Sequence, residues 1–237
     1  MSSTPSSSDH RGQLDQRPIA GIKAVGFDLD NTLYVQTPEV HASIQNHIAR
    51  RAAELLGRDY DAVKREFDAH YAELHSAGQS LREMGIANCG VDPRDIVQEA
   101  LEQADVASVL SRDDRLVAMF DRLDQVLPLF LITTSGRVIA HRKLYAIGIE
   151  PIRFRVALYA EEANRGLERR DGTAFCHVAQ ELGVRLDEML FVGDREKTDI
   201  TPAAELGMKT AIVNARSEHA TIELASIYDL ECLLLGR

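Results

Sequence analysis

The second half of the chain alternates short apolar runs with helical stretches, and this alternation constrains the fold more than any other feature. Each predicted strand is an apolar run bounded by turn-forming residues, and the four lie at 127–133, 153–160, 188–194 and 209–214. The stretches between them repeat apolar residues at helical spacing, at 137–148, 173–183 and 199–207. We therefore predict an α/β fold: a Rossmann-like, doubly wound parallel sheet with helices on both faces.

The first half contains one further predicted strand, at 22–27, and then a long helical region. Helical periodicity is found at 38–57, 59–74 and 92–104. After the strand at 22–27, no convincing strand occurs up to about residue 118. We therefore predict an all-helical domain inserted into the sheet. We predict a disordered tail at residues 1–20 and a helical cap domain at 36–118. The core is predicted to consist of two segments, 21–35 and 119–237.

Composition excludes several classes of function. The net charge of −10 and the pI of about 5.3 disfavour non-specific binding to nucleic acid. The three cysteines form no CxxC pair, which argues against a disulfide framework and a structural zinc site. No apolar run approaches the roughly 20 residues that span a bilayer. We predict a cytoplasmic protein, a monomer or homodimer, with a small-molecule substrate and with neither nucleic acid nor a membrane as a partner.

Acidic residues follow two of the predicted strands. Asp28 and Asp30 are two positions apart after the first strand, so both side chains should point to the same side. Asp194 and Asp199 follow the strand at 188–194. If these loops meet, like charges about 4 Å apart repel by roughly 4 kcal/mol per pair at an effective dielectric near 20. A cation should offset this repulsion, and Mg²⁺ fits best because it selects oxygen ligands.

Each of these residues also has a purely structural interpretation. Asp30 and the following Asn31 are common in turns and helix caps, and Asp194 could cap the helix after its strand. Thr133 could likewise cap the helix that follows it. The joint pattern favours a site: Asp-x-Asp-x-Thr after the first strand, a threonine after a middle strand and Gly-Asp before a late helix.

Three motifs resemble those of the haloacid dehalogenase superfamily, in its phosphatase branch. "FDLDNTLY", "LITTSG" and "FVGDREKTDI" look like its first, second and fourth motifs, and the resemblance covers nearly everything from residue 22 onward. It implies that Asp28 attacks phosphorus to form an aspartyl-phosphate, while Asp30 protonates the leaving alcohol and then activates water. It assigns Mg²⁺ to Asp28, to the backbone carbonyl of Asp30 and to Asp194, with Asp199 in support.

The same resemblance places the phosphate near Thr133. The Thr133 hydroxyl would contact it, and the backbone amides of Thr134 and Ser135 could add donors at the start of the helix. Thr134 stands where relatives often carry asparagine.

The third motif departs from the family pattern, which usually has a lysine there. No lysine occurs between residues 143 and 197, and aligning "RRDGTAF" puts Arg169 at the cationic position. Arginine keeps its charge and binds phosphate in a bidentate way, but its planar group is not equivalent to an ammonium. Arg165 and Arg170 are rivals for the role, and a solvated arginine run is the structural alternative.

The helical insert is expected to close over the site and select the substrate. Its segment at 71–86 contains Gly78 and Gly85, which could form a loop facing the site. Together with the first motif, this segment resembles the pyrimidine 5′-nucleotidase subgroup, which implies a nucleoside monophosphate substrate. Substrate contacts could come from Gln79, Ser80 and Arg82, although polar residues in such a loop can also simply face solvent.

Other functions remain open. A dehalogenase needs the nucleophile Asp28 but no acid at position 30 and no metal. A non-catalytic binding protein could keep the fold after losing the third-motif lysine, yet the other motif residues are intact. A phospho-accepting receiver domain would be about half this length.

Overall fold

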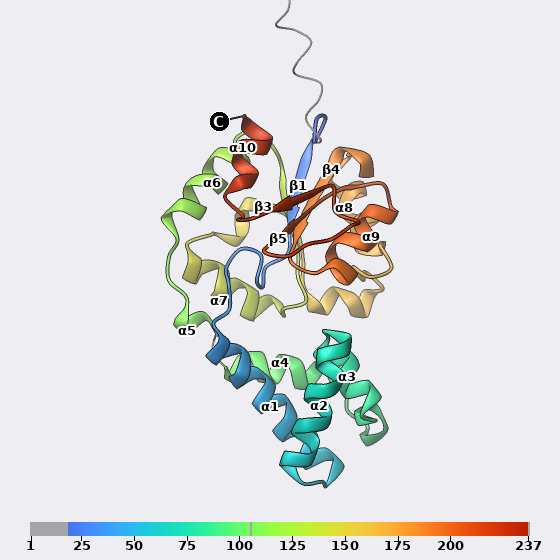
Figure 1. The fold of residues 1–237 in the computed structure, drawn as a ribbon. Coiled ribbons are helices and arrows are strands. Elements are labelled where there is room, and N and C mark those ends of the chain that lie inside the picture. Colours follow the sequence, from blue (N-terminus) through green and yellow to red (C-terminus); the bar gives the residue numbers. More distant parts are fainter. Residues whose placement is uncertain (1–18, 105, 237) are drawn as a thin grey trace, which may run out of the picture.

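The computed structural model describes residues 19–104 and 106–236, and its centre is a single parallel sheet (Figure 1). The sheet order is β3-β2-β1-β4-β5-β6, and every neighbouring pair is parallel. The strands are β1 (Ala24–Phe27), β2 (Leu129–Ile132), β3 (Phe154–Leu158), β4 (Met189–Gly193), β5 (Lys209–Val213) and β6 (Ile222–Leu224). The predicted Rossmann-like α/β class is confirmed.

The strand order reverses beside β1, which lies in the middle of the sheet between β2 and β4. All four residues of β1 are buried, as expected for a strand covered on both faces. Gly26 leaves room for a neighbouring ring, because a Cβ atom there would lie 2.0 Å from the side chain of Phe130. In open parallel sheets, ligands bind at the carboxyl ends of the strands beside such a reversal.

Helices cover both faces of the sheet. One face packs against α6 (Asp114–Asp124), α7 (Arg137–Ile147) and α10 (Asp229–Leu235), in a core that includes Phe27 and Phe120. The other packs against α8 (Thr173–Leu182) and α9 (Thr201–Glu205), around Phe175 and Phe191. Shorter helical segments join these elements: η2 (Pro151–Arg153), η3 (Ala160–Arg165), η4 (Leu186–Glu188) and the π-helical η5 (Glu196–Ile200).

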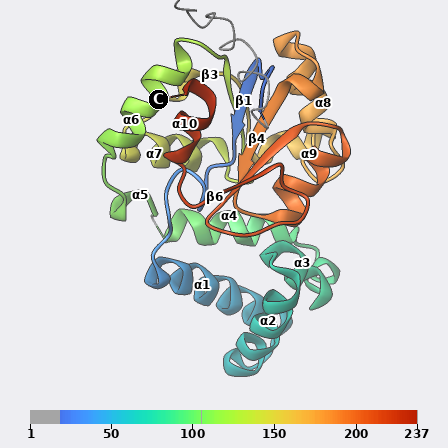
Figure 2. The same ribbon diagram turned by 45° about the horizontal axis from the view of Figure 1, so that its top comes forward.

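A second group of helices has its own apolar core and lies beyond the end of the sheet at which β1 finishes (Figures 1 and 2). In Figure 2, α4 lies directly below the sheet. Asp92 caps α4 by accepting from the amide of Arg94, and Gly57 ends α1 in the left-handed conformation with a φ of 61°. The elements of this helical cap are α1 (Pro38–Leu56), α2 (Tyr60–Leu74), α3 (Ala77–Glu83), η1 (Ile86–Cys89), α4 (Pro93–Gln103) and α5 (Val106–Val109).

The structure differs from the sequence-based expectations in detail. The expected loop around Gly78 is the helix α3, which contains Gly78 and ends before Gly85. The predicted end of the cap at residue 118 falls inside α6, and α6 packs into the core of the sheet. We therefore propose that the cap ends after α5. The predicted tail, up to residue 18, lies outside the described residues.

Among the described residues, no helix combines the length and the apolar character needed to cross a bilayer.

Candidate functional site

Asp28 and Asp30 stand at the carboxyl end of β1. The amide of Asp28 still donates to the carbonyl of Val192 on β4 at 2.9 Å, which fixes Asp28 to the sheet. Leu29 between them is fully buried, as the alternation predicted. The chain then turns at Asn31, whose φ of 59° is in the left-handed region. The turn sends the strand's end towards the cap and leaves both carboxylates at the edge of the sheet.

Three carboxylates converge beside β1. Asp28, Asp194 and Asp199 each offer an oxygen atom within 4.8 Å of the others. Gly193 permits this approach, because a Cβ atom there would lie 2.4 Å from the Cβ of Asp199. Asp199 is fully buried, and its Oδ2 accepts from the amides of Asp194 at 3.1 Å and Arg195 at 3.0 Å. Asp199 therefore holds the loop after β4, and the other two carboxylates are the ones available to a ligand.

Arg169 is the cation that the structure places at this cluster. Its Nη1 lies 2.6 Å from Oδ1 of Asp28 and 3.2 Å from Oδ1 of Asp199, and its side chain is buried. Arg165 instead pairs with a glutamate one turn earlier in the chain, and Arg170 is exposed. Of the three candidate arginines, Arg169 alone contacts the acids among the described residues.

Burial dominates the electrostatics of the cluster. Burial, reinforced by Asp199 and Asp30 and opposed by Arg169, raises the pKa of Asp28 to about 6. Burial and then the charges of Asp28 and Asp199 raise the pKa of Asp194 to about 7. Although burial opposes it, the charges of Asp199 and Asp28 raise the pKa of Arg169 above its usual value. The guanidinium of Arg195 also lies 3.8 Å from Oδ2 of Asp194, yet the pKa values of Asp28 and Asp194 stay raised, so the two arginines do not fully offset the burial and mutual repulsion of the acids.

The donor set fits a hard divalent cation. Oδ1 of Asp194 is buried and has no hydrogen-bond partner within the described part of the chain, an arrangement that is costly unless a ligand fills it. Asp28 is close by, and the ligand atoms that this cluster offers are carboxylate oxygens. Mg²⁺ is commonly held by one or two carboxylates with water and substrate phosphate, which matches two available carboxylates.

We expect magnesium to stabilise the protein more at high pH than at low pH. The raised pKa values mean that the folded state holds protons that the unfolded chain has released. Stability from these two groups is therefore present below about pH 4 and is lost as the pH rises through about 6 and 7. Protons and the cation compete for the same oxygen atoms. Thermal denaturation at about pH 5 and about pH 8, with and without magnesium, measures the difference.

The Asp194→Asn variant is the control for that experiment, because it removes one titrating ligand and should lose the magnesium effect at both pH values. A magnesium-induced rise in the melting temperature that is equal at both pH values in the wild type would contradict the expectation.

The second acid, Asp30, has a separate set of partners. Its Oδ1 accepts from Nζ of Lys143 at 2.6 Å, from Nε2 of Gln36 at 3.3 Å and from the hydroxyl of Tyr34, and its Oδ2 accepts from Oγ of Ser135 at 2.8 Å. Burial alone would raise the pKa of Asp30, but the charge and hydrogen bond of Lys143 lower it below its usual value.

Lys143 was not among the residues singled out from the sequence. A signal for it was present: within α7 it shares the apolar stripe of Ala140, Leu144 and Ile147, all of which are buried. A lysine on the buried face of a helix requires a partner, and the sequence pattern alone does not identify that partner.

The loop after β2 contains the predicted phosphate contacts. Thr133 is buried, and its Oγ1 accepts from the amide of Ser135 at 3.1 Å, so that amide already has a partner. Gln98 on α4 reaches this loop from the cap: its Nε2 donates to the carbonyl of Thr134 at 2.9 Å, and its Oε1 accepts from the amide of Gly136 at 3.1 Å. Gln98 was not predicted, and it ties the cap to the loop.

The predicted cap contacts are spread over α3. Ser80 is buried and donates to the carbonyl of Ser76 at 2.8 Å, so its hydroxyl faces the cap interior. Gln79 is half-buried and Arg82 is exposed. Burial and the charges of Arg169 and Arg82 lower the pKa of Arg170, which places Arg82 on the side of the cap that faces the core. Gln79 and Arg82 remain predicted substrate contacts.

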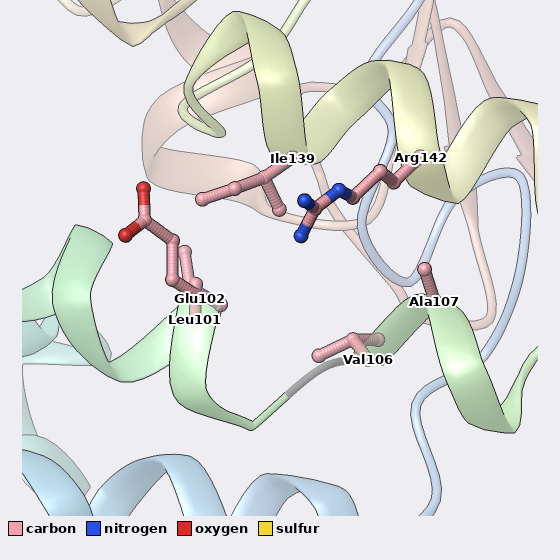
Figure 3. Close-up of a pocket in the computed structure, with 6 residues that line it drawn as sticks. All are labelled: Leu101, Glu102, Val106, Ala107, Ile139 and Arg142. Carbon is pink, nitrogen blue, oxygen red and sulfur yellow. The ribbon is translucent and has the colours of Figure 1, made fainter.

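A crevice lies between α4 and α5 of the cap and α7 of the core (Figure 3). Its volume of about 10 Å³ is roughly that needed by one water molecule, so it has no room for a substrate. The residues that line it come from α4, α5 and α7: Leu101, Glu102, Val106, Ala107, Ile139 and Arg142. The candidate site rests on the clustered acids at the strand ends and not on this crevice.

Comparisons with known proteins agree with this geometry. The sequence model of the haloacid dehalogenase-like hydrolases matches residues 22–207. Two curated relatives, from Methanopyrus kandleri and Methanocaldococcus jannaschii, are named glyceraldehyde 3-phosphate phosphatase. Each is 27% identical over 80% of this chain, covering 82% and 83% of the relative. The solved structure of a HAD phosphatase from Thermococcus onnurineus superimposes with a TM-score of 0.64 at 20% identity, over 91% of this chain and 99% of that one.

Proposed function

Since the chain belongs to the haloacid dehalogenase-like hydrolase family, we propose that it hydrolyses phosphomonoesters through an aspartyl-phosphate on Asp28. The observation that carries this proposal is the pairing of two acids at the end of β1 with two different cations. Asp28 contacts Arg169, and Asp30 contacts Lys143. One acid is thereby available as nucleophile and the other as acid and base.

The chemistry proceeds in two displacements at phosphorus. An oxygen of Asp28 bonds to phosphorus while the bond from phosphorus to the alcohol oxygen breaks, and Asp30, which has to enter this step protonated, gives its proton to that oxygen. Water then attacks phosphorus, Asp30 takes a proton from it, and the aspartyl-phosphate bond breaks to release phosphate and restore Asp28. Arg169 balances negative charge beside the nucleophile throughout.

We assign the divalent cation to Asp28, Asp194 and the backbone carbonyl of Asp30, and propose Mg²⁺. When bound, it would neutralise charge on the phosphoryl oxygens. Asp199 supports the loop through the amides of Asp194 and Arg195. Thr133 and the amide of Thr134 supply neutral donors at the start of α7.

The substrate we propose is a small phosphorylated metabolite. The names of the curated relatives, glyceraldehyde 3-phosphate phosphatase, support this class. A nucleoside 5′-monophosphate is the second candidate, supported by the likeness of "FDLDNTLY" and the α3 segment to pyrimidine 5′-nucleotidases. For either substrate, Gln79 and Arg82 are the proposed cap contacts.

Three exposed free cysteines, Cys89, Cys176 and Cys232, support the proposal of a reducing, cytoplasmic compartment.

A substrate panel tests this proposal. Phosphate release is measured with glyceraldehyde 3-phosphate, glycerol phosphate, sugar phosphates, nucleoside monophosphates and p-nitrophenyl phosphate, with magnesium and with a chelator. We expect turnover that depends on the divalent cation and a higher kcat/KM for the three-carbon phosphates than for nucleotides. Preference for pyrimidine nucleotides would select the second candidate. Cation-independent release of halide from a haloacid, without phosphate release, would overturn the proposal.

A further inference from the structure

Lys143 is a charged residue buried completely within the helical layer of the core. Its side chain is 0% exposed, and it lies on α7 among the buried side chains of Ala140, Leu144 and Ile147. Removing an ammonium group from water is strongly unfavourable unless the group is paired and hydrogen-bonded. The structure supplies that compensation at Nζ, on the side of α7 where the site lies.

Lys143, Ser135 and Asp30 form a closed triangle of polar contacts. Nζ of Lys143 lies 2.6 Å from Oδ1 of Asp30 and 3.0 Å from Oγ of Ser135. The Ser135 hydroxyl in turn donates to Oδ2 of Asp30 at 2.8 Å. Two oxygens of one carboxylate are thus fixed by two donors that are themselves in contact, which defines the plane of the carboxylate as well as its position.

The two oxygens of Asp30 accept different numbers of hydrogen bonds. Oδ1 accepts from Lys143, Gln36 and Tyr34, whereas Oδ2 accepts only from Ser135. A carboxylate oxygen has about two lone-pair sites, so Oδ1 is saturated and Oδ2 retains one. Oδ2 is therefore the oxygen that can exchange a proton with a reacting group.

We propose that Lys143 is a positioning residue that, with Ser135, holds the Asp30 carboxylate so that Oδ2 carries the transferred proton. The proposal rests on the proposed phosphatase function. In the first displacement the proton leaves Oδ2 for the alcohol oxygen as the bond from that oxygen to phosphorus breaks. In the second, Oδ2 accepts a proton from the attacking water as the aspartyl-phosphate bond breaks.

This role is distinct from that of Arg169. Arg169 contacts Asp28 and Asp199, whereas Lys143 contacts Asp30 and Ser135. A buried ion pair that served stability alone would leave the rate unchanged in a variant that still folds. The experiment therefore needs a readout that reports on proton transfer.

The test variant is Lys143→Met, which keeps the length and apolar stem and removes the charge. Its matched control is Lys23→Met, at a lysine that is 62% exposed and paired with Glu188. We expect Lys143→Met to lower kcat with glycerol phosphate at least about tenfold, with KM changed less than about threefold. With p-nitrophenyl phosphate, Lys143→Met should slow the phosphorylation step less, because nitrophenol needs little protonation as it leaves. The rate of this step is measured as the first-turnover release of nitrophenol. Lys23→Met should match the wild type.

A double-mutant cycle with Asp30→Asn shows whether Lys143 acts through Asp30. Once Asp30 cannot transfer a proton, Lys143→Met should have no further effect on kcat. If Lys143→Met lowered kcat by the same factor in the wild-type and Asp30→Asn backgrounds, the proposal would be wrong. It would also be wrong if the variant slowed the first step equally for p-nitrophenyl phosphate and for an alkyl phosphate.

A crystal structure of Lys143→Met provides a readout that does not need activity. We expect the plane of the Asp30 carboxylate to rotate because Oδ1 loses its ammonium donor; an unmoved carboxylate would contradict the proposal. If Lys143→Met does not fold, Ser135→Ala removes the other donor, and the same kinetic pattern and the same rotation are expected. Failure of the wild type to hydrolyse any phosphomonoester would instead overturn the proposed function, and the crystal structure would still decide the positioning of Asp30.

Discussion

Replacing Asp28 by asparagine should lower turnover of every phosphomonoester substrate by about 10⁴-fold or more, because the nucleophile of the first displacement is lost and no aspartyl-phosphate forms for the second. Asparagine has nearly the same shape, and Asp199 remains beside Arg169 at 3.2 Å, so the fold should persist. Phosphate release and trapping of the phosphorylated protein after acid quench are the two measurements. Wild-type protein should carry acid-stable phosphate on Asp28, and the variant should carry none.

The control for this experiment is Asp187→Asn, at an exposed aspartate paired with Arg185 at 2.7 Å. That variant should retain full activity. An Asp28→Asn protein with the circular dichroism spectrum of the wild type and more than about a tenth of its turnover would exclude Asp28 as the nucleophile.

Removing the charge of Arg169 should have the largest effect on stability. The Arg169→Met variant leaves Asp28 and Asp199 buried without their shared cation, and breaking a buried pair from one side typically costs about 3–5 kcal/mol. We expect the free energy of unfolding in urea, without magnesium, to fall by about this amount. Activity should fall as well, because the charge beside the nucleophile is lost.

Arg185→Met is the matched control for Arg169→Met. Arg185 is exposed and its pair with Asp187 is at the surface, so its replacement should leave the free energy of unfolding close to that of the wild type. If Arg169→Met destabilised the protein no more than this control, the buried contacts of Arg169 would not matter for folding.

The sequence predicted the central strands well because their apolar runs are distinctive. The runs at 127–133 and 188–194 contain β2 and β4, and Gly148 ends α7 as expected. The strand β6 and the helix α10 were not predicted. Both are short, and both acquire their burial from packing against distant parts of the chain rather than from a local pattern.

The site residues that belong to short sequence motifs could be predicted from the sequence. Spacing after β1 indicated that Asp28 and Asp30 lie on one side of the chain, and the structure brings Asp28, Asp194 and Asp199 together. The partners Lys143 and Gln98 were not predicted. Each contact depends on how an entire helix, α7 or α4, lies against the strand ends, and such placement is a tertiary property that no short motif contains.

Gln98 makes the shape of a core loop depend on a helix that belongs to the cap. It joins segments 36 residues apart by one donated and one accepted hydrogen bond. If the cap moved off the sheet, both bonds would break together, and the Thr134 carbonyl and the Gly136 amide would lose these partners. Bonds within the core, such as the one from the amide of Ala160 to the carbonyl of Ser135, would remain, so α4 adds to the restraint on this loop without supplying all of it.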